Sequence, residues 1–229
     1  MRIKITSDST CDLSPRQVTE KDITIIPLIV MKDGQEFIDG VTIDKQRFYE
    51  RLVESDQLPT TSQATPAAFD KEYAAVRAAG DSAVVLTIAS DFSGTYQSAC
   101  IAAAEYDNIF VVDSRSAAIG AGILAEYALQ CVEQGMDARA IAEALAEKRG
   151  KICLVALLDT LEYLKKGGRI SKTVAFAGGL LNISRSSTAK FSSSARREGR
   201  SRATTCSCRR STRAAASTLM SRSCWATAA

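Results

Sequence analysis

The chain of 229 residues predicts an α/β protein with a doubly wound, mainly parallel sheet. Short apolar runs alternate with segments of helical spacing, which is the pattern of parallel strands joined by crossover helices. Three of these runs end in Ser, Thr or Asp, near residues 7, 89 and 113. Because parallel strands end at one edge of a sheet, and such sheets bind ligands there, we expect a polar site at that edge.

Apolar runs and helical spacing define the elements in order. They are a strand at 3–5, a helix near 15–21, a strand at 23–30, a hairpin turn at 32–35, a helix at 44–55, a polar loop at 59–66, a helix at 67–78, a strand at 83–88, a helix near 95–106, a strand at 109–112, and helices at about 116–134 and 138–148. Pro27 makes 23–30 an edge or bulged strand, because proline lacks the N–H of a central strand. Asp44, Thr65 and Asp137 are the predicted helix N-caps.

The stretch from Ile88 to Ala99 is the strongest candidate for a binding site. It joins a predicted buried strand to a predicted helix and contains Ser93, Gly94 and Thr95. The first turn of a helix has unpaired N–H donors and the positive end of the helix dipole, so hydroxyls there suit an anion. We therefore expect this junction to hold the acidic head of a small ligand.

Two other segments allow both a functional and a purely structural interpretation. The hydroxyl- and Asp-rich loop 6–12 suits either ligand binding or turn and N-cap chemistry. Arg169 follows a Gly-Gly turn and offers a bidentate partner to carboxylate or phosphate. A helix C-cap beside a solvated arginine explains the same residues.

Composition excludes several classes of protein. Hydrophobic residues make up 46% and charged residues 24%, which is ordinary for a soluble domain, and no apolar run approaches a membrane span of about 18 residues. The N-terminus lacks a signal-peptide core, so we expect a cytoplasmic protein without stable membrane insertion. His is absent, which excludes a Ser-His-Asp triad, and the seven Cys have no zinc spacing. We expect no catalytic residue, no metal and no cofactor.

The chain divides into three regions. Residues 1–150 form the α/β domain that carries the binding loops. Residues 151–183 begin a second α/β domain, with a strand at 152–157, a helix at 159–166 and a helix through 173–181. Residues 184–229 form a tail that we expect to be disordered.

The tail differs sharply from the body in composition. Ser, Arg, Ala and Thr account for 36 of its 46 residues, and it has ten Lys or Arg and one acid, Glu198. The chain carries a net charge of +3, so the body without this tail is acidic, at −6, and gives no reason to expect nucleic acid as a partner.

A frameshift after Ile183 explains the tail best. Codons for residues 183–190 exist such that one added A yields I-K-P-V-I-D-C-K, and continuing through Arg200 yields V-L-V-V-G-K-A-R-G-S. The restored text has strand-like apolar runs that the written tail lacks. We therefore predict that residues 184–229 are out of frame and that the second domain is truncated.

Several motifs resemble those of the DegV family, in order along residues 1–183. They are Ser7 to Leu13 (SDSTCDL), Pro59 to Pro66 (PTTSQATP), Ser93 to Ala99 (SGTYQSA), Val112 to Ser114 (VDS) and Leu161 to Ser171 (LEYLKKGGRIS). The resemblance implies a two-domain α/β protein that binds a long-chain fatty acid between its domains. Bacterial members serve as the acyl-carrying subunit of a fatty acid kinase, in which a separate catalytic subunit phosphorylates the carboxylate.

The resemblance also assigns roles to individual residues. Thr61, Ser62 and Ser93 match the hydroxyls that hold the carboxylate, and Gly94 and Thr95 add contacts. A final match is Arg169, near the head group or the partner. This chain would then be a ligand-binding subunit rather than an enzyme, with its acyl-binding half impaired by the lost frame.

Two alternatives from other classes stay open. A hydrolase or transferase would use Ser93 or Cys11 as nucleophile, although without His only Lys or Asp would remain as base. A nucleic-acid-binding protein would act through the basic tail.

Overall fold

The computed structural model describes residues 2–54, 57–158, 161–169 and 187–190. Its centre is a four-stranded sheet in the order β2-β1-β6-β7, with every neighbouring pair parallel. The strands are β1 (Ile3–Asp8), β2 (Thr24–Ile26), β6 (Ser82–Thr87) and β7 (Ile109–Asp113). The predicted doubly wound, mainly parallel α/β fold is confirmed.

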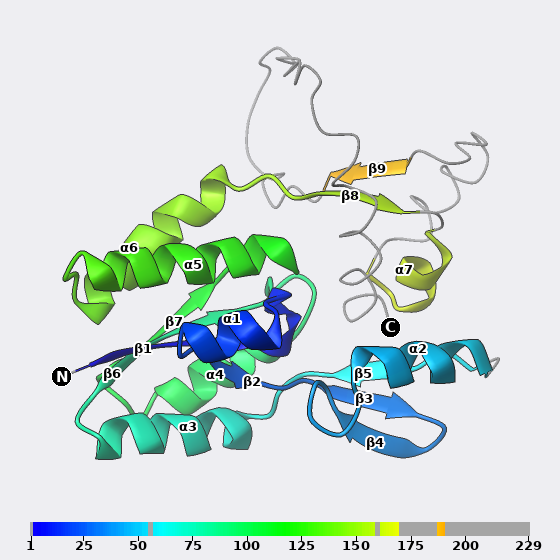
Figure 1. Ribbon diagram of the computed structural model, residues 1–229, viewed down its shortest axis with the longest axis horizontal. Coiled ribbons are helices and arrows are strands. Elements are labelled where there is room, and N and C mark those ends of the chain that lie inside the picture. Colours follow the sequence, from blue (N-terminus) through cyan, green and yellow to red (C-terminus); the bar gives the residue numbers. More distant parts are fainter. Residues whose placement is uncertain (1, 55–56, 159–160, 170–186, 191–229) are drawn as a thin grey trace, which may run out of the picture.

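Helices cover both faces of this main sheet (Figure 1). On one face lie α5 (Ile119–Glu133) and α6 (Ala138–Lys148), and on the other lie α3 (Pro66–Ala78) and α4 (Thr95–Ala103). All six residues of the central strand β6 are buried. Its alternate side chains serve two cores: Val84 and Leu86 pack with α5 and α6, whereas Ala83 and Val85 pack with α3 and α4.

A second, antiparallel sheet in the order β4-β3-β5 lies beside the main sheet. It consists of β3 (Ile29–Lys32), β4 (Gln35–Ile38) and β5 (Thr60–Ser62), with α2 (Lys45–Glu54) alongside (Figure 1). The turn between β3 and β4 has positive φ at Asp33 (51°) and Gly34 (73°), which suits a two-residue hairpin. The predicted hairpin is therefore confirmed.

Two sequence expectations are wrong in this region. The run 23–30 was expected to be a single strand, but it divides into β2 and β3, which belong to different sheets. Pro27 lies between them, and its missing N–H interrupts the ladder. The segment 59–66 was expected to be a loop, but Thr60–Ser62 pairs with β3 as strand β5.

The three predicted N-caps are confirmed. Asp44 accepts the Arg47 N–H at 2.8 Å, Thr65 accepts the Ala68 N–H at 3.3 Å, and Asp137 accepts the Ala140 N–H at 2.9 Å. The early helix α1 (Pro15–Glu20) begins with a capping box formed by Ser14 and Gln17.

The chain beyond α6 contributes η2 (Arg149–Lys151), β8 (Val155–Leu158), α7 (Glu162–Lys166) and β9 (Ser187–Lys190). β9 pairs antiparallel with β8. β9 falls within the predicted tail, and the division of the chain into two domains and a tail stays a prediction. The rest of the tail and the predicted helix at 173–181 lie outside the described residues.

Candidate ligand-binding site

The ends of three parallel strands meet at one edge of the main sheet, as the sequence predicts. At the end of β1, Asp8 Oδ2 accepts the Ile88 N–H at 2.6 Å. At the end of β7, Asp113 accepts the Ser90 N–H at 3.2 Å and the Ser90 hydroxyl at 2.8 Å. The loop between β6 and α4 is therefore held by a carboxylate on each side.

The Asp8 carboxylate also organises its own loop. It accepts hydrogen bonds from the Thr10 N–H (3.0 Å) and the Thr10 hydroxyl (2.6 Å), and the 3₁₀ turn η1 (Ser9–Cys11) follows. Burial raises the pKa of Asp8 above its ordinary value, against these hydrogen bonds, which lower it. These contacts are turn chemistry, so the structural interpretation accounts for this part of loop 6–12.

Ser93 and Gly94 lead into helix α4, which begins at Thr95, and the hydroxyls of Ser93 and Thr95 contact each other. Ser93 Oγ lies 2.8 Å from Thr95 Oγ1 and accepts the Thr95 N–H at 3.3 Å. Thr95 is fully buried, whereas Ser93 is half-buried. When the Thr95 hydroxyl donates to Ser93, the Ser93 proton is available to an anion, and the paired hydroxyls polarise each other.

Strand β5 brings Thr61 and Ser62 to the same junction through the next residue, Gln63. The Gln63 Nε2 group donates to the Ser98 hydroxyl at 2.9 Å, and its side chain lies against Gly94. Five of the six predicted site residues, all except Arg169, thus lie on segments that meet. Sequence reasoning missed Gln63 as a functional residue, because this contact spans 35 positions and nothing local signals it.

Arg169 lies at the end of α7. Its guanidinium donates to the Gly167 carbonyl at 2.5 Å, a contact within its own turn. This geometry fits the C-cap interpretation of the Gly-Gly turn. The predicted contact between Arg169 and a ligand head group stays a prediction.

The nucleophile alternative gains no support from these contacts. The hydroxyl that contacts Ser93 belongs to Thr95, which is not a base near neutral pH. Cys11 is 2% exposed, and burial raises the pKa of its thiol, whereas a nucleophilic cysteine needs a lowered pKa.

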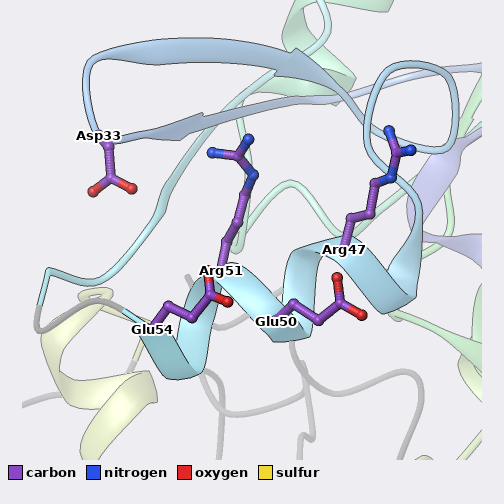
Figure 2. Close-up of a pocket in the computed structure, with 5 residues that line it drawn as sticks. All are labelled: Asp33, Arg47, Glu50, Arg51 and Glu54. Carbon is purple, nitrogen blue, oxygen red and sulfur yellow. The ribbon is translucent and has the colours of Figure 1, made fainter.

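A surface cavity of ≈ 520 Å³ lies elsewhere, between α2 and the β3–β4 turn (Figure 2). Figure 2 shows Arg47 and Arg51 pointing toward the hairpin, and Arg51 lies 4.8 Å from the centre of the Phe37 ring. The described residues that line the cavity are all charged, so the cavity does not suit an acyl chain. Its lining residues are Asp33, Arg47, Glu50, Arg51 and Glu54.

The described part of the chain lacks two other features. It contains no cluster of three or more His, Cys, Asp or Glu arranged to hold a metal ion. Within the same residues, no helix has the length and apolar character needed to cross a bilayer.

The fold and this edge define a class: an α/β protein with a hydroxyl-lined strand-to-helix junction at the carboxyl edge of a parallel sheet. A family model described as "Uncharacterised protein, DegV family" matches residues 2–190. The chain belongs to the DegV family. DegV domain-containing proteins of Clostridium perfringens and Deinococcus radiodurans are each 35% identical over 184 residues, which is 80% of this chain. The chain spans 66% of the length of each, just under two thirds.

Solved structures agree with this assignment. A DegV family protein from Thermus thermophilus, described by its fatty acid binding, is 32% identical with a TM-score of 0.72, over 82% of this chain and 72% of that protein. A stearic acid-binding protein from Eubacterium ventriosum is 33% identical with a TM-score of 0.71, over 78% of this chain and 64% of that protein. Proteins of similar fold and sequence thus bind fatty acids.

Proposed function

We propose that this chain binds a long-chain fatty acid and holds its carboxylate at the junction of β6 and α4. The observation that carries the proposal is the meeting of two hydroxyl-bearing segments, β5 with Thr61 and Ser62 and the start of α4 with Ser93. The fatty-acid-binding relatives support the choice of ligand.

The chemistry of the junction suits a carboxylate. Removing a carboxylate from water is costly unless it accepts several hydrogen bonds. In this proposal Ser93 donates one, Thr61 and Ser62 add theirs, and Gly94 and Thr95 add contacts at the start of α4, where the positive end of the helix dipole favours an anion. Each acyl CH₂ that leaves water adds about 0.8 kcal/mol.

The proposal extends to partners and to the rest of the chain. The bound carboxylate would be presented to a separate kinase subunit for phosphorylation, so that this chain is a carrier rather than an enzyme. Arg169 would contact the head group or that partner. If residues 184–229 are out of frame, the acyl chain is held less tightly here than in a frame-restored version.

The first test is direct. The full chain is expressed in bacteria or mixed with oleate, and bound acyl chains are measured by native mass spectrometry. We expect one fatty acid per chain, and a preparation without any bound acid contradicts the proposal. Adding the kinase subunit and ATP then tests presentation, with acyl phosphate as the readout.

Two variants test the hydroxyls. Ser93→Ala and Thr61→Ala should each weaken oleate binding about 3- to 10-fold, the loss expected for one hydrogen bond to a charged group. Thr19→Ala, an exposed change on α1, is the matched control and should bind as the parent does. Equal affinity of all four proteins would place the carboxylate elsewhere.

A further inference from the structure

The side chain of Gln63 lies along the first turn of α4. Its Nε2 group donates to the hydroxyl of Ser98, which is 1% exposed, one helical turn beyond Gly94. Its Oε1 atom occupies the space beside Gly94. Gln63, an exposed residue, is thereby held by one hydrogen bond and lies close to Gly94.

The absence of a side chain at Gly94 leaves room for the Gln63 amide. A Cβ atom there would lie 1.8 Å from Gln63 Oε1, 2.8 Å from Cδ and 3.2 Å from Nε2. Yet the φ of Gly94 is −71°, which any residue adopts, so its backbone conformation does not demand glycine. Its missing side chain therefore serves the close approach of Gln63.

Gln63 connects two separately built parts of the protein. It follows β5, whose only described pairing is with β3 in the small sheet, while Gly94 belongs to the β6–α4 junction of the main sheet. The adjacent Ala64, 1% exposed, is anchored in the core formed with α3 and α4. The chain path past β5 is thus secured by Ala64, and Gln63 sets how β5 faces α4.

We propose that Gln63 is a positioning residue, which fixes the Thr61 and Ser62 hydroxyls relative to the Ser93 hydroxyl by lying across Gly94. The inference rests on the proposed carboxylate site. It adds the residue that holds the two parts of that site, β5 and the start of α4, in a fixed relative position. Gln63 itself need not touch the ligand. Removing its amide should lower affinity while the fold, anchored by Ala64, keeps its thermal stability.

The experiment is a double-mutant cycle in the full chain, with oleate affinity measured by displacement of a fluorescent fatty acid. Gln63→Ala should weaken binding about 3- to 10-fold, and Gly94→Ala should do the same because its methyl group displaces the amide. The double variant should bind no more weakly than Gln63→Ala alone. Matched controls are Gln134→Ala, an exposed glutamine after α5, and Gly150→Ala, where a Cβ meets nothing within 4 Å.

The outcomes separate this inference from the proposed function. Additive losses in the double variant, or parent-like affinity of Gln63→Ala, overturn the positioning role while the binding function stands. Absence of oleate binding by the parent overturns the function itself. Amide hydrogen exchange, measured without ligand, gives an independent readout. Gln63→Ala should speed exchange at residues 60–62 and 93–95. Unchanged exchange rates would overturn the positioning role of Gln63.

Discussion

Ser93 and Thr61 belong to one proposed site, but the strands behind them differ greatly in burial. Ser93 follows β6, in which every residue is buried between two helical layers. Thr61 lies on β5, in which Thr60 and Ser62 are exposed, and the neighbouring helix α2 has no buried residue. The two supports are joined by the packing of Ala64 in the core with α3 and α4 and by the hydrogen bond from Gln63 to Ser98.

A substitution in the buried strand β6 should have the largest effect on the free energy of unfolding. Leu86→Ala removes a side chain that is fully buried between β6, α5 and α6, and should lower the free energy of unfolding by about 2–5 kcal/mol. Ile38→Ala in β4, where the residue is 37% exposed, should cost about 1 kcal/mol or less. Chemical denaturation of both variants measures this difference, and equal losses would abolish the contrast between the two sheets.

A smaller effect is expected where α5 approaches the loop after β1. A Cβ on Gly122 would lie 2.6 Å from the backbone oxygen of Cys11, which cannot move as a flexible side chain would. Gly122→Ala should therefore destabilise the protein by about 1–3 kcal/mol. Thermal unfolding beside the Gly150→Ala control tests this, and parent-like stability of both would show that the loop yields easily.

The smallest expected effect is the pH dependence of stability that Asp8 causes. Burial holds the pKa of Asp8 above its unfolded value near 3.8, so the folded state favours the protonated form. The stability that this difference in the pKa of Asp8 contributes is therefore complete below pH 3.8. It is lost as the pH rises through the pKa that Asp8 has in the folded state.

Asp8→Asn isolates this contribution. In the parent, the free energy of unfolding should decline as the pH rises through the folded-state pKa of Asp8, and the variant should lack this decline. The other carboxylates titrate equally in both proteins. Denaturation curves from pH 4 upward measure the difference between parent and variant. A difference that does not change with pH would mean that Asp8 is ionised in the fold throughout.

The sequence predicts the buried half of the molecule well because its signals are local. The apolar run of β6, the caps at Thr65 and Asp137, and the hydroxyls of Ser93 and Thr95 all lie within a few residues of what they define. The strand-end aspartates follow from the same logic, since parallel strands must share an edge.

The small sheet was harder to predict because its structure depends on distant partners. Thr60–Ser62 has no apolar alternation and becomes a strand only by pairing with β3. Pro27 signalled an interruption, but not that the two halves would enter different sheets. Gln63 has no local signature at all, since its role arises from a glycine in another element.

The two aspartates that hold the β6–α4 loop also set an order of events during synthesis. One hydrogen bond joins residues 80 positions apart, and the other joins residues 23 apart. The loop thus gains its second carboxylate only after Asp113 has left the ribosome, and long-range pairings of this kind form slowly. A nascent chain that ends before Asp113 carries Ser93 on a loop that lacks one of its two supporting carboxylates, so the proposed carboxylate site is complete only once β7 has been made.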